Sequence, residues 1–209
     1  NLVGNPYPCA INWDNVTKTN VQNMIMFVKP GGGYATYADG ISTNSGGIDL
    51  RYIQPGQGFY TRATASGSSI VFTEGSKDIT NSPLRLLTAP KEQIALNVFA
   101  KTSGGNYISG NPGTTISGNP SYRQLRLNLQ DATHIDEAVV VFNPGSDAVA
   151  GIEDATFFGG STVSLSTLSS DNKDLSINFM PDLAQVAEVK LTVNAVASGN
   201  LKLNFTDFS

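Results

Sequence analysis

The sequence predicts an all-β protein, an antiparallel β-sandwich of the jelly-roll kind with at most single turns of helix. Three observations predict it. Most apolar segments alternate with polar residues at the two-residue period of half-buried strands. Charged residues make up only 14% of the 209 residues and glycines number 21, which suits many short strands joined by turns. No stretch of ten residues shows the period of an amphipathic helix.

The opening stretch, residues 1–14, is expected to lock the fold. Pro6 and Pro8 restrict their own backbone and that of the preceding residues to extended conformations, so the lead-in should be stiff. The residues from Ile11 to Asp14 then alternate as in a strand with one buried face. We expect this stretch to pack beside the strand at 57–59, where a glycine permits close approach. The residues with this predicted structural role are Pro6, Pro8, Trp13, Gly58 and Phe59.

The first half of the chain alternates between strand candidates and turns rich in glycine and proline. A continuous apolar run at 24–28 predicts a buried strand, and residues 16–23 before it suit a short helical turn. Further strands are expected at 34–37, 59–61, 69–73, 84–87 and 93–99.

The second half shows the clearest alternation, with four strands spaced by roughly a dozen residues, as in antiparallel sandwiches. Before them, the apolar run at 138–142 predicts a strand covered on both faces, and 147–156 suits one helical turn. The long loop 104–123, in which SGNP occurs twice, is the expected contact surface. Strands are expected at 125–129, 138–142, 163–168, 175–179, 188–193 and 201–205.

The whole chain, 1–209, is expected to form a single module with a possible subdivision near 83–92. Because the chain starts with Asn1 and not with methionine, we expect it to be a fragment of a larger protein. No apolar run approaches the roughly 20 residues of a membrane span, so membrane insertion is not expected.

The inventory of reactive residues argues against an enzyme. The only imidazole, His134, lies in a polar loop without a nucleophile motif, and the only thiol, Cys9, cannot form an internal disulfide. The acidic pairs at 136–137 and 153–154 are neighbours in sequence, which in a strand point to opposite faces. A net charge of −4 also makes nucleic acid an unsuitable partner.

A structural calcium ion is the one cofactor that the sequence suggests. Asp171 and Asp174 offer hard oxygen ligands in a surface turn, and calcium prefers such ligands. The turn lacks a D-x-D-x-D-G pattern, and Asp-Asn is ordinary turn chemistry, so a turn without metal is the alternative.

Tyrosines suggest a second binding chemistry. Tyr107 and Tyr122 lie within the long loop, where their rings could stack on sugars beside asparagine and glutamine side chains. The alternative is that these rings fill cross-strand pairs and core edges.

Several motifs resemble a module of large exported surface proteins of Bacteroidota. The run LVGNPYP at 2–8, followed by Ala10-Ile11 and Trp13-Asp14, is similar to a segment that these proteins share. The similarity extends in order over nearly the whole chain: Gly33-Tyr34, Tyr37 with Gly40, IQPGQGF at 53–59, IVFT at 70–73, 125–129, 136–142, Asp154, and LSIN at 175–178 with Pro181.

This resemblance implies an extracellular all-β module of an adhesin-like or gliding-associated protein that is exported by the type IX secretion system. In that family a separate C-terminal sorting domain commonly follows such a module. The location implied is the bacterial cell surface or the medium.

We therefore expect a non-catalytic structural or adhesive module. Two alternatives remain open: a carbohydrate-binding module of a surface or secreted polysaccharide-active protein, and a self-assembling filament or surface-layer subunit, whose exposed edge strands would pair. The expected partners are other domains of the same protein or a surface polymer, with a glycan as a further candidate.

Overall fold

The protein is all-β, as the sequence predicts. A computed structural model describes residues 1–81, 100–101, 107–108, 122–182, 188–196 and 200–208. Helical structure in these residues is limited to two single 3₁₀ turns, η1 (Trp13–Asn15) and η2 (Glu74–Ser76). The strands predicted at 84–87 and 93–99 lie outside the described residues.

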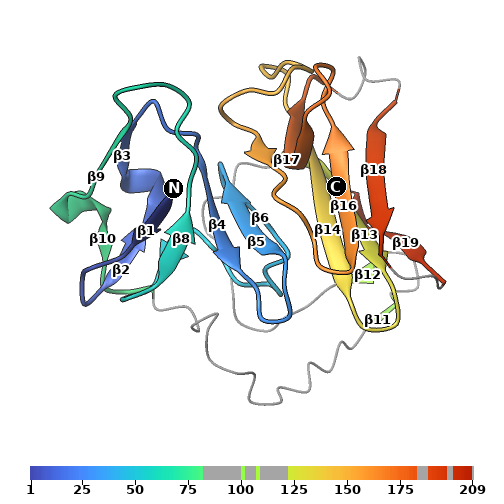
Figure 1. Ribbon diagram of the computed structural model, residues 1–209, viewed down its shortest axis with the longest axis horizontal. Coiled ribbons are helices and arrows are strands. Elements are labelled where there is room, and N and C mark those ends of the chain that lie inside the picture. The colour runs from blue at the N-terminus through green and yellow to red at the C-terminus, as the bar shows by residue number, and fades with distance from the viewer. Residues whose placement is uncertain (82–99, 102–106, 109–121, 183–187, 197–199, 209) are drawn as a thin grey trace.

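The first half of the chain builds a five-stranded sheet, which we call the first sheet, and two small sheets beside it (Figure 1). The first sheet has the order β1 (Leu2–Gly4), β8 (Gly58–Tyr60), β4 (Met24–Val28), β5 (Tyr34–Ala38), β6 (Ile41–Thr43). The small sheets are β10 (Lys77–Asp78), β2 (Ala10–Asn12), β7 (Tyr52–Ile53), and β3 (Thr17–Thr19) with β9 (Ser69–Val71).

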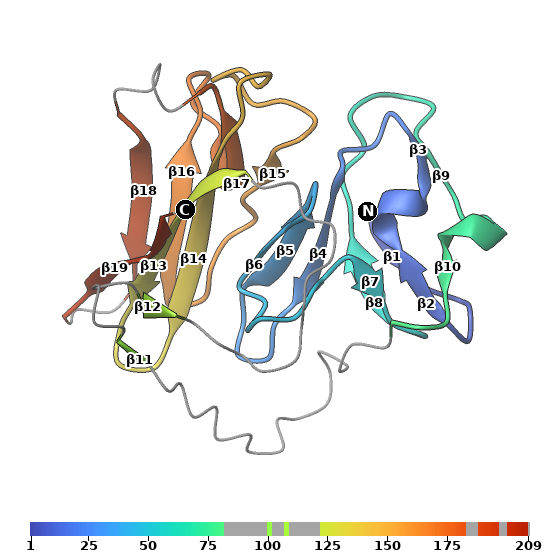
Figure 2. The same cartoon turned by 180° about the vertical axis from the view of Figure 1, so that it is seen from behind.

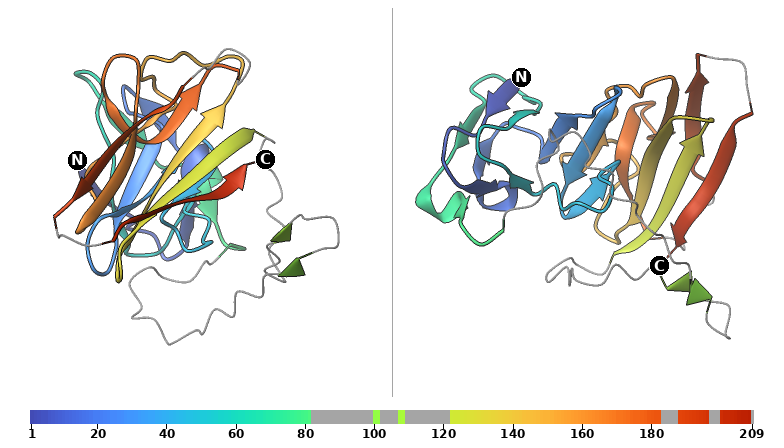
Figure 3. Two further views of the ribbon diagram at one scale, coloured as in Figure 1. Left: turned by 90° about the vertical axis from the view of Figure 1, so that its right-hand side faces the viewer. Right: turned by 90° about the horizontal axis from the view of Figure 1, so that it is seen from below.

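The second half builds one larger sheet, the second sheet, which curls into a half-barrel (Figure 3). Its described pairs are antiparallel except for β14 and β17, which run parallel, so the sandwich is not purely antiparallel. Its order is β18 (Lys190–Ala195), β16 (Val163–Leu168), β17 (Asp174–Met180), β14 (Ile135–Phe142), β13 (Arg123–Gln130), β19 (Lys202–Phe208), and β15 (Ala155–Thr156) pairs with β17. A separate pair is β11 (Ala100–Lys101) with β12 (Tyr107–Ile108).

The first sheet is the middle layer of the molecule (Figure 2). Successive residues of β4 point to opposite faces, as the pleat of a strand requires. Ile25 and Phe27 therefore join the core shared with the small sheets, whereas Met24 and Met26 join a core shared with the second sheet. This is why residues 24–27 are continuously apolar, whereas Val28 at the end of β4 is exposed.

The second sheet completes that shared core and has a further apolar face of its own. Val139 and Val141 of β14 pack toward the first sheet, and Ala138 belongs to a core on the other side. Both faces of β14 are buried, which confirms the prediction made from the apolar run at 138–142.

The opening stretch packs where the sequence predicts. Strand β1 pairs with β8, placing Gly4 opposite Gly58, and the Trp13 ring meets the Phe59 ring edge to face at 5.7 Å. Trp13 is fully buried. It does not continue the strand, however, because β2 ends at Asn12, whose side chain accepts a hydrogen bond from the backbone of the following 3₁₀ turn.

The stiffness of this stretch has a side-chain contribution as well as its prolines. The buried Asn5 amide donates to the carbonyls of Cys9 and Ile53 at 2.9 Å, and its oxygen accepts from the Tyr7 backbone. Pro6 and Pro8 are exposed between these anchors. The Asn5 side chain thus anchors the loop whose backbone the prolines keep extended.

Two predicted helical turns are wrong. Residues 16–23 contain β3, which pairs with β9 some fifty positions later, so a long-range partner overrides a local preference. Residues 147–156 form a loop that ends in β15, and the Ala148 carbonyl is bound by the Ser170 backbone.

Candidate functional site

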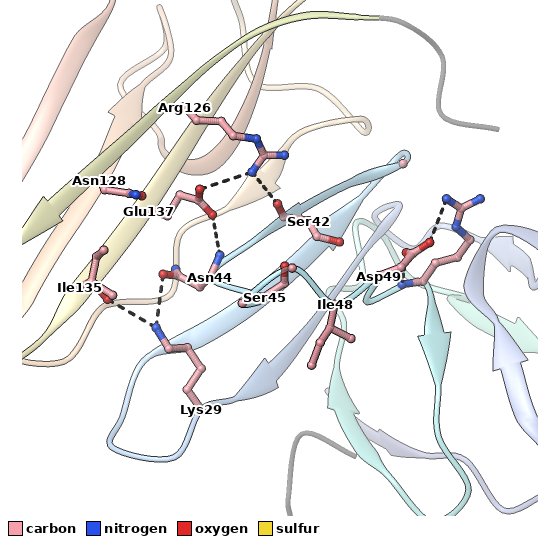
Figure 4. A pocket seen from close by; sticks show the side chains of 14 residues that line it. Lys29, Ser42, Asn44, Ser45, Ile48, Asp49, Arg126, Asn128, Ile135 and Glu137 are labelled. Atoms are coloured by element: carbon pink, nitrogen blue, oxygen red, sulfur yellow. Dashed lines mark hydrogen bonds and ion pairs between the residues drawn. The ribbon is translucent and has the colours of Figure 1, made fainter. Parts of the chain in front are cut away.

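A polar groove lies between the first and second sheets (Figure 4). Its volume is about 520 Å³, within the range of small-molecule binding sites. One wall is β6 and the loop 44–51, and the other is formed by β13 and β14. Polar side chains and two isoleucines line it, including Lys29, Ser45, Ile48, Arg126, Asn128 and Glu137. We call it the intersheet groove.

Backbone turns place the residues of the first wall. Lys29 follows β4 in a tight turn, where its backbone N–H donates to the Gly33 carbonyl at 3.0 Å. Asn44 follows β6 with a φ of +54°, a left-handed conformation that asparagine tolerates. The glycines at 46–47 continue with positive φ, so the chain turns back and presents Ser45 and Ile48 to the groove.

A hydrogen-bonded chain fixes the two walls to each other (Figure 4). The Arg126 guanidinium on β13 donates to the Ser42 carbonyl on β6 at 3.0 Å and lies 3.4 Å from the Glu137 carboxylate on β14. Glu137 also accepts from the Asn44 backbone at 2.8 Å, and the Asn44 amide donates to the buried Asp136. The groove is therefore shaped before any ligand arrives.

Arg51 lines the groove and is held by two carboxylates. Its guanidinium lies 3.2 Å from Asp49 and 3.5 Å from Asp14. Asp14 in turn accepts the Tyr37 hydroxyl at 2.8 Å. Burial, followed by the charge of Asp14, raises the pKa of Tyr37 well above its ordinary value, so this hydroxyl stays protonated and keeps donating.

Of the three cations that line the groove, Lys29 is the one without an ion pair among the described residues. Its ammonium lies 3.3 Å from the Asn44 side-chain oxygen and 3.5 Å from the Ile135 carbonyl. Burial lowers the pKa of Lys29, and the charges of Asp136 and Glu137 partly offset that effect. The groove thus holds a partly desolvated ammonium with donor capacity to spare.

The arrangement suits noncovalent binding of a polar ligand. Serine, asparagine and glycine groups supply hydrogen bonds, charged groups stand at both ends, and Ile48 and Ile135 offer apolar contact. Three of the 13 lysines and arginines of this charge-poor chain line this one groove.

One of the two predicted sugar-stacking tyrosines, Tyr122, does not line the groove. The Tyr122 ring packs edge to face on Phe179 at 5.8 Å and joins the core between the sheets. The side chain of Tyr107 and most of the loop 104–123 lie outside the described residues.

The two predicted calcium ligands accept hydrogen bonds from groups of the protein itself. Asp171 accepts from the Ser169 hydroxyl at 2.7 Å and from the Ala150 backbone at 3.0 Å, and these bonds lower its pKa. Asp174 accepts from the Ser166 hydroxyl at 2.8 Å. Across the described residues, three or more histidine, cysteine or acidic side chains are nowhere grouped as metal ligands would be.

The remaining reactive residues are placed as follows. His134 lies in the turn between β13 and β14, 2.7 Å from the Thr133 hydroxyl and 3.4 Å from Asp131. Cys9 is half-buried as a thiol. Asp154 is buried and accepts the backbone N–H groups of Gly151 and Phe179 at 2.6 Å each.

Sequence reasoning missed the groove because its walls come from segments up to a hundred positions apart. Only the run TNSGG at 43–47 stands out locally in the sequence, and its composition predicts a flexible loop. The charged residues of the groove are spread from Lys29 to Glu137, and neither Asp49 with Arg51 nor Asp136 with Glu137 forms a recognisable binding motif.

Comparisons of the chain with protein-family models, curated proteins and solved structures found no match. Within the described residues, no helix has the length and apolar character needed to cross a membrane.

Proposed function

We propose that the chain is a non-catalytic adhesive module of an extracellular bacterial surface protein and that it holds a carbohydrate partner in the intersheet groove. The observation that carries the proposal is the fixed polar groove, whose walls are joined by the bonds of Arg126, Asn44 and Glu137. The resemblance to exported Bacteroidota proteins supports the location.

The chemistry of the lining supports a sugar partner. Hydroxyl groups both donate and accept, and the groove offers amide, hydroxyl and charged groups that can pair with them. Ile48 and Ile135 can contact the C–H face of a sugar ring. Because the walls are already ordered, binding would cost little conformational entropy.

The test is a glycan array followed by calorimetric titration of the best ligand. Ser45→Trp fills the groove and should abolish binding, and Ser170→Trp, at an exposed turn, is the matched control and should bind normally. Absence of binding to any glycan, or equal binding by both variants, would overturn the proposal.

A specific observation favours self-assembly as a second candidate function. Within the described strand order, β18 and β19 are the edges of the second sheet. Phe205 on β19 is 71% exposed and Val193 on β18 is 48% exposed. Phe205 lies opposite the core residue Leu127, and Val193 lies opposite the core residue Leu165, so both exposed side chains are on the face of the sheet that carries this core. Apolar edge strands of this kind pair readily with a second copy.

Light scattering over a concentration series tests the assembly. The chain should form oligomers that Phe205→Lys removes, whereas Phe158→Lys, at another exposed phenylalanine, should leave them unchanged. A strict monomer at high concentration would count against this candidate.

A further inference from the structure

We propose that the intersheet groove selects acidic sugars and seats the ligand's carboxylate against the ammonium group of Lys29. This inference rests on the proposed carbohydrate-binding function and adds the class of ligand. It follows from which groups of the groove are already engaged and which are not.

Both carboxylates that line the groove are engaged by the protein itself. Glu137 accepts from the Asn44 backbone and lies against the Arg126 guanidinium. Asp49 accepts from the Arg51 backbone at 3.0 Å and lies 3.2 Å from its guanidinium. A basic ligand would therefore have to compete with Arg51, Arg126 and the Asn44 backbone for these two carboxylates.

Carboxylates of the protein already pair with the guanidinium groups of both arginines in the groove. These guanidinium groups are therefore not the primary contacts for the carboxylate of a ligand. Arg51 pairs with Asp14 and Asp49, and Arg126 pairs with Glu137. A ligand carboxylate that displaced either acid would leave that acid without its partner in a partly buried site, which is costly.

Lys29 differs from both arginines. The ion pairs among the described residues do not include it, and its two hydrogen bonds go to uncharged oxygens at 3.3 and 3.5 Å. Both distances exceed the usual length of a strong N–H to oxygen hydrogen bond. A carboxylate can approach this ammonium without breaking a protein ion pair.

The nearby Asp136 carboxylate does not take the place of a ligand carboxylate beside the Lys29 ammonium. Its two oxygens accept from the Asn44 amide at 2.8 Å and from the Leu165 backbone at 2.9 Å, so they are held by neutral donors inside the protein. The charges of Asp136 and Glu137 act to raise the pKa of Lys29 and partly offset the lowering that burial causes. A protonated, partly buried ammonium gains more from a ligand carboxylate than an exposed one does.

The overall charge of the protein limits the size of the acidic ligand. With a net charge of −4, the chain repels a long polyanion at a distance, and the attraction is local to the groove. A short oligosaccharide with one or a few uronic acids fits both the charge and the volume of about 520 Å³.

The test compares trigalacturonate with its methyl ester, which has the same sugar ring but no charge. The wild-type chain should bind the acid more tightly than the ester, and added sodium chloride should narrow the difference. Lys29→Gln should weaken binding of the acid by about tenfold and leave the ester nearly unaffected, because only the charged contact is lost. Lys29→Arg should keep most of the preference.

Lys190→Gln, which removes an exposed lysine on β18, is the matched control and should behave as the wild type. Equal affinity of the wild type for acid and ester, or an equal loss for both ligands in Lys29→Gln, would overturn the inference while the carbohydrate function stands. Binding to no glycan at all would overturn the carbohydrate function as well. Circular dichroism of each variant verifies folding.

Discussion

Trp13 shows how one side chain joins the opening stretch to the rest of the fold. It is fully buried, meets Phe59 edge to face, and has the Lys18 ammonium 4.6 Å from its ring centre. The backbone carbonyl of Trp13 also accepts from Lys18 at 2.8 Å. The indole thus packs between a core ring and a cation.

Trp13→Ala should lower the free energy of unfolding by about 3–5 kcal/mol, because it leaves a large cavity in the first core. Trp13→Phe should cost much less, since the indole Nε1 makes no hydrogen bond within the described part of the chain. Chemical denaturation followed by circular dichroism measures both. Unchanged unfolding of Trp13→Ala would show that the opening stretch is a tether and not a lock.

Asp154 should make stability depend on pH. Burial raises its pKa to about 6, although the hydrogen bonds from two backbone N–H groups favour the ionised form and oppose this shift. Since the native pKa is above the unfolded value of about 3.9, the carboxyl stabilises the fold below about pH 4, and this contribution is lost as pH rises through 6.

The free energy of unfolding should therefore fall by up to about 3 kcal/mol between pH 4 and pH 7 through this one group. Asp154→Asn should flatten that slope, because an amide does not titrate. The low pKa of Asp131, about 2, acts in the opposite sense but only at lower pH. A ¹³C titration of Asp154 with a midpoint near 4 would show that burial does not raise the pKa of this carboxyl group.

At the scale of elements, two glycines that look alike in sequence differ in space. A Cβ at Gly58 would meet Leu2 Cδ1 at 3.7 Å and the Val3 carbonyl at 3.9 Å, which are ordinary contacts. The predicted need for a glycine in β8 is therefore not steric. A Cβ at Gly160 would collide with the Val163 carbonyl and come within 2.9 Å of Asp136.

We expect Gly58→Ala to change the free energy of unfolding by less than about 1 kcal/mol. Gly160→Ala should destabilise by more than about 2 kcal/mol, because the turn before β16 would have to move away from Asp136. Thermal denaturation of the pair measures the difference. A larger loss for Gly58→Ala than for Gly160→Ala would contradict the described packing.

The strands were predictable where a local pattern and a buried face agree. The run at 24–28 is apolar on both faces because Met24 and Ile25 enter different cores, and its strand was predicted correctly. The segment at 16–23 carries no such signal, and its pairing with β9 depends on residues far away. The groove depends on how two sheets pack, which alternation does not specify.

At the scale of the molecule, the two sheets share a core and should unfold together. Met24 and Met26 of the first sheet pack with Val141 and Phe179 of the second. Several bonds also cross between the sheets, among them the buried Gln22 amide donating to the Asp154 carbonyl at 2.6 Å. We infer one cooperative unit.

Urea unfolding followed by Trp13 fluorescence, which reports the first core, and by far-ultraviolet circular dichroism should give coincident transitions. Phe179→Ala should shift both by the same amount, with a loss of about 3–5 kcal/mol, because the shared core is weakened. If the transition followed by Trp13 fluorescence kept its midpoint in Phe179→Ala, the two halves of the chain would unfold independently.

The proposed binding site of the molecule is the intersheet groove. Its most direct test is a ¹H–¹⁵N NMR titration of the chain with trigalacturonate. The shifts should be concentrated in the loop 44–51, at Lys29, and on β13 and β14 around Asn128 and Glu137. Shifts confined to the exposed edges β18 and β19, or spread without a focus, would contradict it.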